Sequence, residues 1–101
     1  MARSHRLLNG QSVAGQSSIV HPQRNADETG IFQIRITGGT PDATIRCEGR
    51  ADENAPWYTI ATLNEGDLVG GTAAVAVPLF PQMRANASEV TSGNANAWLV
   101  E

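Results

Sequence analysis

The fold is decided by the stretch IFQIRITGGTPDATIRCEG, which spans residues 31–49. Its first part, Ile31–Thr37, alternates apolar with polar side chains, which is the pattern of a strand that buries one face. The turn-forming residues GGTPD follow at 38–42, and the alternation resumes over Ala43–Gly49. The stretch therefore predicts two strands joined by a hairpin turn.

Short alternating segments continue to the end of the chain. The expected strands are Trp57–Leu63, Thr72–Leu79, Gln82–Thr91 and Ala95–Glu101, the last two joined by a turn at 92–94. Turn signals recur at intervals of about ten residues, and no window carries an apolar stripe at helical spacing, so the predicted class is all-β. Six or seven short strands predict an antiparallel β-sandwich or a jelly-roll-like barrel.

The start of the chain differs in composition from the rest. Residues 1–29 are polar and rich in Gln, Ser, Asn and Gly, without helical periodicity. We therefore expect an extended N-terminal arm over residues 1–30, in which Gln11–Val20 is compatible with one edge strand, followed by a sandwich domain over residues 31–101. Such an arm either orders on a partner, or is a frayed terminus or an added first strand.

The size and charge of the chain limit the classes of partner that are expected for it. The 101 residues fit one domain, and two Phe, two Trp and one Tyr supply its large side chains, so the core is thin and association with other subunits is favoured. All seven basic residues are arginines and the net charge is −3. Because the arginines are scattered, they form no stripe that follows phosphates, and we expect no nucleic acid partner. Arginine suits ion pairs at subunit contacts, although codon bias explains the same preference.

The sequence contains no pattern typical of catalysis or metal binding. His5 and His21 have no Cys, Asp or Glu at ligand spacing beside them. Cys47 lies in an alternating strand and is expected to pack as a small apolar residue. The acidic pairs at 27–28 and 52–53 have neighbouring side chains that point apart, unlike a catalytic dyad. We therefore expect no enzyme activity, no cofactor and no metal.

The beginning of the chain also bears on where the protein is made. Residues 1–15 carry Arg3 and Arg6 but no continuous apolar run. The expectation is that there is no signal peptide and no membrane span, and that synthesis and assembly take place in the cytoplasm.

The two tryptophans admit two interpretations. Trp57 and Trp98 are expected to pin the core of the sandwich, or to serve as exposed platforms on which sugars stack. The sequence favours the first interpretation and leaves the second open.

The order of short motifs in the last seventy or so residues resembles small virion structural proteins of tailed bacteriophages. These motifs are Gly49-Arg50, Pro56-Trp57 with Ile60, the stretch LFPQMRA at 79–85, Thr91-Ser92-Gly93 and Trp98. Several such proteins are capsid cement or decoration proteins. The resemblance implies a β-sandwich that binds the major capsid protein on the outer surface of the virion, as a homo-oligomer with a trimer favoured.

Arginine chemistry and the resemblance together predict the interface residues. These are Arg3, Arg6, Arg24, Arg50 and Arg84. The alternative function is a tail-associated or host-recognition β-sandwich module that binds glycans.

Overall fold

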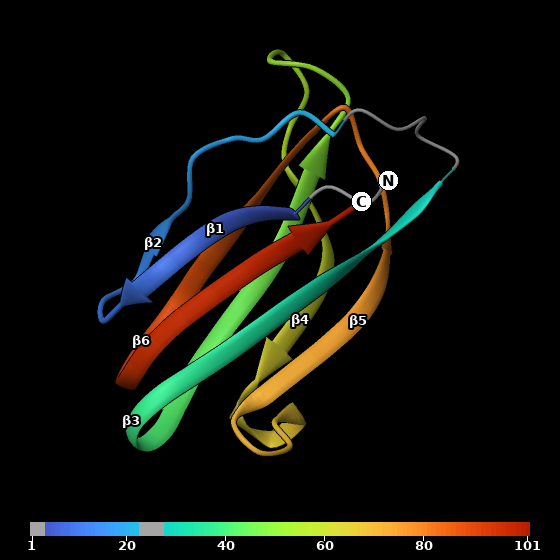
Figure 1. Ribbon diagram of the computed structural model, residues 1–101. Coiled ribbons are helices and arrows are strands. Elements are labelled where there is room, and N and C mark those ends of the chain that lie inside the picture. Colours follow the sequence, from blue (N-terminus) through green and yellow to red (C-terminus); the bar gives the residue numbers. More distant parts are fainter. Residues whose placement is uncertain (1–3, 23–27) are drawn as a thin grey trace.

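The computed structural model describes residues 4–22 and 28–101, which form an antiparallel sheet of six strands (Figure 1). The strands are β1 (Ser4–Gln11), β2 (Gly15–Gln16), β3 (Thr29–Arg50), β4 (Tyr58–Asn64), β5 (Thr72–Pro78) and β6 (Gln82–Val100), with a 3₁₀ turn, η1 (Glu65–Asp67), after β4. The predicted all-β, antiparallel class is confirmed.

The two long strands, β3 and β6, form a ribbon that folds over into two layers (Figure 1). In the first layer, the N-terminal half of β3 pairs with β5 and with the C-terminal half of β6, which in turn pairs with β1. In the second layer, the C-terminal half of β3 pairs with β4 and with the N-terminal half of β6, which pairs with β2. A two-layer sandwich is thus built around one folded ribbon.

The corner of this ribbon replaces both predicted hairpins. β3 runs through residues 38–42 and β6 runs through residues 92–94, and the two halves of each strand pair with other strands rather than with one another. The pair Thr37↔Asn94 lies before the corner and the pair Asp42↔Ser92 lies after it. β3 therefore uses more residues than β6 to turn the corner and takes the longer outer path. Gly93 lies on the inner path at a φ of 96°, and a Cβ there would lie 2.8 Å from Ile36 Cγ2. The hairpin predictions were wrong because glycine-rich turn chemistry also suits a corner that two strands turn together.

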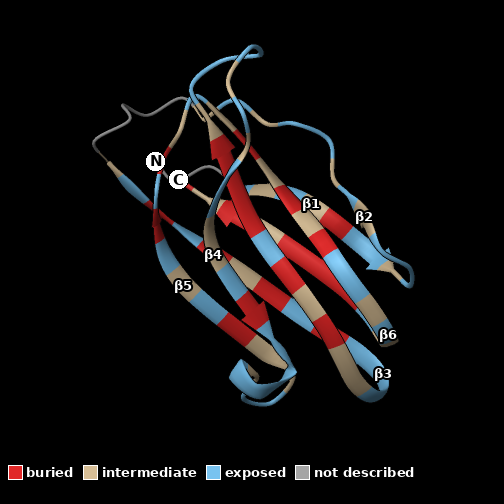
Figure 2. Cartoon of the chain, turned by 180° about the vertical axis from the view of Figure 1, so that it is seen from behind, coloured by how far each residue is buried: buried red, intermediate tan, exposed pale blue. Residues whose placement is uncertain are grey.

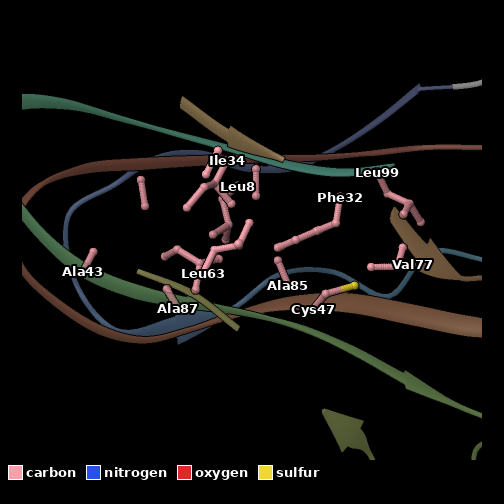
Figure 3. Packing of buried hydrophobic residues seen from close by; sticks show 14 of the residues in the cluster. Leu8, Phe32, Ile34, Ala43, Cys47, Leu63, Val77, Ala85, Ala87 and Leu99 are labelled. Carbon is pink, nitrogen blue, oxygen red and sulfur yellow. The ribbon is translucent and has the colours of Figure 1, made fainter. Parts of the chain in front are cut away.

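The core fills the space between the layers with side chains of moderate size. Its largest fully buried members are Phe32, Ile34, Ile45, Leu79, Met83, Leu99, Val77 and Cys47. Figure 3 shows Ile34 and Leu8 of the first layer opposite Leu63 and Ala87 of the second. Buried and less buried residues alternate along β3 and β6 (Figure 2), so these strands present a second, outer face to the surroundings.

Part of the segment predicted as an arm belongs to the sheets. β1 pairs with β6 in the first layer, and the short β2, which lies within residues 11–20, pairs with β6 in the second. Beyond β2, Val20 forms a bridge with Met83. β1 is also tied to the chain end, because His5 Nε2 contacts the buried carboxylate of Glu101.

Candidate functional site

The outer face of the second layer carries a set of polar side chains that oppose one another on β3 and β6. Alternation turns Cys47 and Met83 into the core, and the residues next to them therefore point outward. The register pairs Glu48 with Arg84 and Arg50 with Gln82. Residues 36 and 32 positions apart in the sequence thus become direct neighbours across the two strands.

Trp57 joins two arginines of this face. It immediately precedes β4, which pairs with the same half of β3. The guanidinium carbon of Arg50 lies 4.3 Å from the centre of the indole ring, and that of Arg84 lies 4.1 Å from it. Both distances are within the range of cation–π attraction. We refer to Glu48, Arg50, Trp57, Gln82 and Arg84 as the Arg–Trp cluster.

The carboxylate of Glu48 holds one of these arginines in place. Glu48 is 7% exposed, and it accepts a hydrogen bond of 2.7 Å from Arg84 Nε and one of 3.3 Å from Asn86 Nδ2. A buried carboxylate requires such partners, because an unpaired charge away from water is costly. Arg84 is therefore committed to an ion pair within the protein.

Arg50 is held more lightly than Arg84. Its Nε donates a hydrogen bond of 2.7 Å to Gln82 Oε1. Among the residues that the structure describes, no carboxylate pairs with it. A guanidinium has five N–H donors in a planar fork, and among the described residues only the Nε of Arg50 is seen to donate a hydrogen bond.

An open apolar hollow lies near the end of β3, where Ala51 follows the strand. It has a volume of about 320 Å³ and is lined by Ala51, Leu79, Phe80 and Pro81. The ring of Tyr58 stacks on that of Phe80 with a centroid distance of 6.2 Å, and Tyr58 is 64% exposed. The hollow therefore has a continuous apolar lining with an exposed aromatic ring beside it.

The other predicted interface arginines have different surroundings. Arg6 lies on the first layer, 4.7 Å from the centre of the Trp98 ring, and donates from its second terminal nitrogen to Asn9 Oδ1 and Asn96 Oδ1. Arg3 and Arg24 lie outside the described residues. The structure thus unites Arg50 and Arg84 in one cluster and places Arg6 elsewhere.

Both tryptophans lie outside the buried core, which corrects the favoured interpretation that they pin it. Each indole is half-buried and stacks with arginine instead. The interior is filled by Phe32 together with smaller apolar side chains, which pack closely between the two layers.

The titratable groups of the described residues offer no arrangement for metal chemistry. In residues 4–22 and 28–101, no three or more His, Cys, Asp or Glu side chains lie together in a group that could hold a metal ion. Burial, with a smaller effect from the charge of Glu48, raises the pKa of the Cys47 thiol from 9.0 to about 12. Cys47 therefore packs as an uncharged thiol, as the sequence predicted. Within the same residues, no helix is long and apolar enough to cross a membrane.

Sequence reasoning did not single out Glu48, Gln82 or Tyr58, or the hollow beside them. Their roles depend on which strands pair and in which register. The available signal was the matching polarity of the stretches 46–50 and 82–86, which becomes informative once these stretches are known to be neighbours.

Comparison with known proteins adds information on the fold. No protein-family model and no curated protein matches the chain. Among solved structures, the chain is similar to the SPBc2 prophage-derived protein YomS, with 13% sequence identity and a TM-score of 0.55, over 100% of this chain and 94% of that one. A mutant of CBM29-2, a family 29 carbohydrate-binding module, shows 10% identity and a TM-score of 0.47 over 100% and 91% of the two chains. At this level of identity, the likeness to YomS shows a shared β-sandwich-like fold.

Proposed function

We propose that this protein is a phage virion structural protein of the capsid cement or decoration type, which attaches to the outer surface of a capsid through the Arg–Trp cluster. The observation that carries the proposal is the position of Arg50 and Arg84 against Trp57, held by Gln82 and Glu48. Arginine and tryptophan are the residues most enriched among those that dominate protein interfaces. Because neighbouring side chains order them in advance, little conformational entropy is lost on binding.

The kind of partner follows from the charge of this cluster. It contains two guanidinium groups and one carboxylate, so it complements an acidic protein surface. In the proposed function the partner is the major capsid protein, and the activity is attachment rather than a reaction. Several copies, with a trimer favoured, would place several such clusters on one capsid and make weak individual contacts hold.

Attachment to capsids that lack this chain tests the proposal. The purified protein is expected to co-sediment with such capsids at micromolar concentration and to raise the temperature at which they disrupt. Trp57→Ala should weaken attachment about tenfold or more, because the residue lies at the centre of the proposed contact. Trp98→Ala, which removes the other arginine-stacked indole, is the matched control. An absence of co-sedimentation, or equal losses in both variants, would overturn the proposal.

A second function, binding of glycans by a tail-associated or host-recognition module, is favoured by Tyr58. Tyr58 is exposed, and its ring stacks on that of Phe80. An exposed aromatic ring offers its face to the apolar side of a sugar ring. A glycan array, together with acrylamide quenching of the indoles in the presence of any glycan that binds, tests this function. Silence on the array would exclude it.

A further inference from the structure

We propose that two copies of this chain associate through the free edge of β5, which pairs antiparallel with the same strand of the second copy about a two-fold axis. This inference goes beyond the proposed function, since it concerns contact between copies of the chain and not attachment to a capsid. It predicts pairs in solution, whereas the resemblance to virion proteins favours a trimer, so the mass of the assembly distinguishes the two.

β5 is an edge strand of the first layer (Figure 1). In the part of the chain that the structure describes, its only strand partner is β3. The register of the two strands runs from Thr29↔Pro78 to Arg35↔Thr72 without a shift. β5 is therefore a regular strand of seven residues with one unpaired side, and an edge of this kind is a template for another strand.

The other edge strands of the two layers have features that discourage such pairing. β1 is shifted twice in register against β6, β4 is shifted once against β3, and β2 is only two residues long. β5 has the sequence TAAVAVP, which contains no charged residue. Two copies of β5 therefore meet without like charges opposite each other, which makes it the edge best suited to pair with itself.

The unpaired backbone groups of β5 belong to alternate residues. Just beyond the strand, the backbone N–H of Leu79 donates to the carbonyl of Glu28, which precedes β3. Because bonded residues alternate along each strand of an antiparallel pair, the odd-numbered residues of β5 bond β3. Ala74 and Ala76 therefore direct their N–H and C=O groups away from β3, to the free edge.

Both ends of this row of backbone groups are closed. At the start of β5, the N–H of Thr72 donates to the carbonyl of Val69, and the N–H of Val69 donates to the carbonyl of Thr72. At the end of the strand, Pro78 has no N–H to donate. The N–H groups that remain on the free edge of β5 are those of Ala74 and Ala76.

The positions of these groups select the register of the pair. A pair centred on Ala76 bonds the N–H of each Ala76 to the carbonyl of the other, and the N–H of each Ala74 to the carbonyl of Pro78 in the second copy. Every free donor of both edges is then satisfied. A pair centred on Val75 would instead place Pro78 of one copy where Val69 of the other already lies.

Exposed apolar side chains lie on either side of this edge. Val69, beside the start of β5, is 84% exposed, and Ile31, which is opposite Ala76 in the register of β3, is 41% exposed. Cover for apolar surface of this kind adds to the backbone hydrogen bonds of the pair. Because a single strand edge buries less area than most stable interfaces, we expect a dissociation constant on the order of 10–100 µM.

Concentration-dependent measurements on the full chain test the pair. Sedimentation equilibrium from about 1 to 1,000 µM is expected to show a monomer that becomes a dimer. Over the same range, amide hydrogen exchange should slow at Ala74 and Ala76, whereas Val75 and Val77, which bond β3, stay protected throughout. A monomer at every concentration, a trimer, or a dimer that leaves exchange at Ala74 and Ala76 unchanged would overturn the inference.

Substitutions at Ala76 separate the edge from the fold. Ala76→Pro removes an N–H that faces away from the sheet, where an edge strand tolerates proline, and should weaken the pair about tenfold or more. Ala76→Ser keeps the N–H and is the matched control, which should pair as the wild type does. Equal pairing of the proline variant, shown to be folded by circular dichroism, would overturn the inference.

A charge variant keeps the test decisive if the proline variant does not fold. Ala76 is exposed, so Ala76→Lys adds a solvated charge that lies opposite its own copy across the two-fold axis. The pair should weaken at low salt and recover in part at high salt, because salt screens the repulsion between the two ammonium groups. A dimer as tight as that of the wild type at low salt would overturn the inference.

Discussion

The two layers of the sandwich each stack arginine on tryptophan, but they use the contact differently. On the first layer, Arg6 lies over Trp98 and is bonded to Asn9, Asn96 and the backbone carbonyl of Leu8. On the second layer, Arg50 lies over Trp57 with one hydrogen bond, to Gln82. Arg6 therefore spends its donors inside the protein, whereas Arg50 keeps most of them.

This difference follows from where each arginine sits in the sheet. Arg6 is on β1, at the edge of its layer, and its bonds to Asn96 tie that short strand to β6. Arg50 is on β3, which is already held by backbone pairing with β4 and β6 on both sides. Because backbone hydrogen bonds already hold β3 in the sheet, the Arg50 side chain is not needed to hold the strand. Its guanidinium therefore keeps unused donors. The same residue pair thus secures a strand in one layer and forms the proposed binding group in the other.

The largest expected effect comes from Arg84, the second arginine over Trp57. Arg84→Met leaves the Glu48 carboxylate buried without its cation, and we expect a loss of about 3 kcal/mol in the free energy of unfolding. Urea denaturation measures this loss. Combining Arg84→Met with Glu48→Gln should recover most of the stability, because the buried charge is then absent. A loss below about 1 kcal/mol in the single variant would contradict the structural role given to Arg84.

Cys47, on the inner face of β3, gives a change in the free energy of unfolding that can be compared with those of the arginines on the outer face. Folding raises the pKa of Cys47 to about 12, from 9.0, so the native protein retains a proton that the unfolded chain releases above pH 9. This contribution to stability is complete below pH 9 and is lost as the pH rises towards 12. Relative to Cys47→Ala, the wild-type free energy of unfolding should fall by about 1.5 kcal/mol between pH 9 and 10.5. Urea denaturation at each pH measures this fall. Equal pH profiles of the wild type and Cys47→Ala would contradict the prediction.

The positions of the strands could be predicted from the sequence, but the way in which the strands pair could not. Alternation of side chains located the strands of residues 31–101, because burial of one face leaves a local pattern. The corner was misread as two hairpins, since GGTPD at 38–42 and Gly93 have turn chemistry that suits both arrangements. Choosing between them requires knowing that residues 42–50 pair with residues 82–92, which is a nonlocal fact.

The same limit applies to the start of the chain and to the site. β1 has the polar sequence SHRLLNGQ, whose place in the sheet depends on contacts of His5 with Glu101 and of Arg6 with Asn96. Both partners are about ninety residues away. Arg50 and Arg84 were expected at an interface on the basis of their residue type and a resemblance. Their meeting at Trp57 depends on register, which no local pattern contains.

Substitution of Arg6 tests whether this arginine ties β1 to β6 in the first layer. Arg6→Gln removes its bonds to Asn9, Asn96 and the carbonyl of Leu8, and we expect a loss of about 1 kcal/mol because the site is partly exposed to water. Amide hydrogen exchange should become faster in β1 than in the second layer, since the strand loses its tie to β6. Capsid attachment is expected to stay unchanged in this variant. Unaltered exchange in β1 would show that backbone pairing alone secures the strand.

The smallest expected effect on stability belongs to Arg50. Its size tests whether Arg50, unlike Arg6 and Arg84, has little structural role. Arg50→Gln removes one hydrogen bond and one cation–π contact, but it leaves no buried carboxylate unpaired and no strand edge untied. We therefore expect a change within about 0.5 kcal/mol in urea denaturation. Arg6→Gln, the same substitution on the other layer, is the control. If Arg50→Gln were as destabilising as Arg84→Met, both arginines over Trp57 would be structural, and the second layer would clamp its strands as the first layer does.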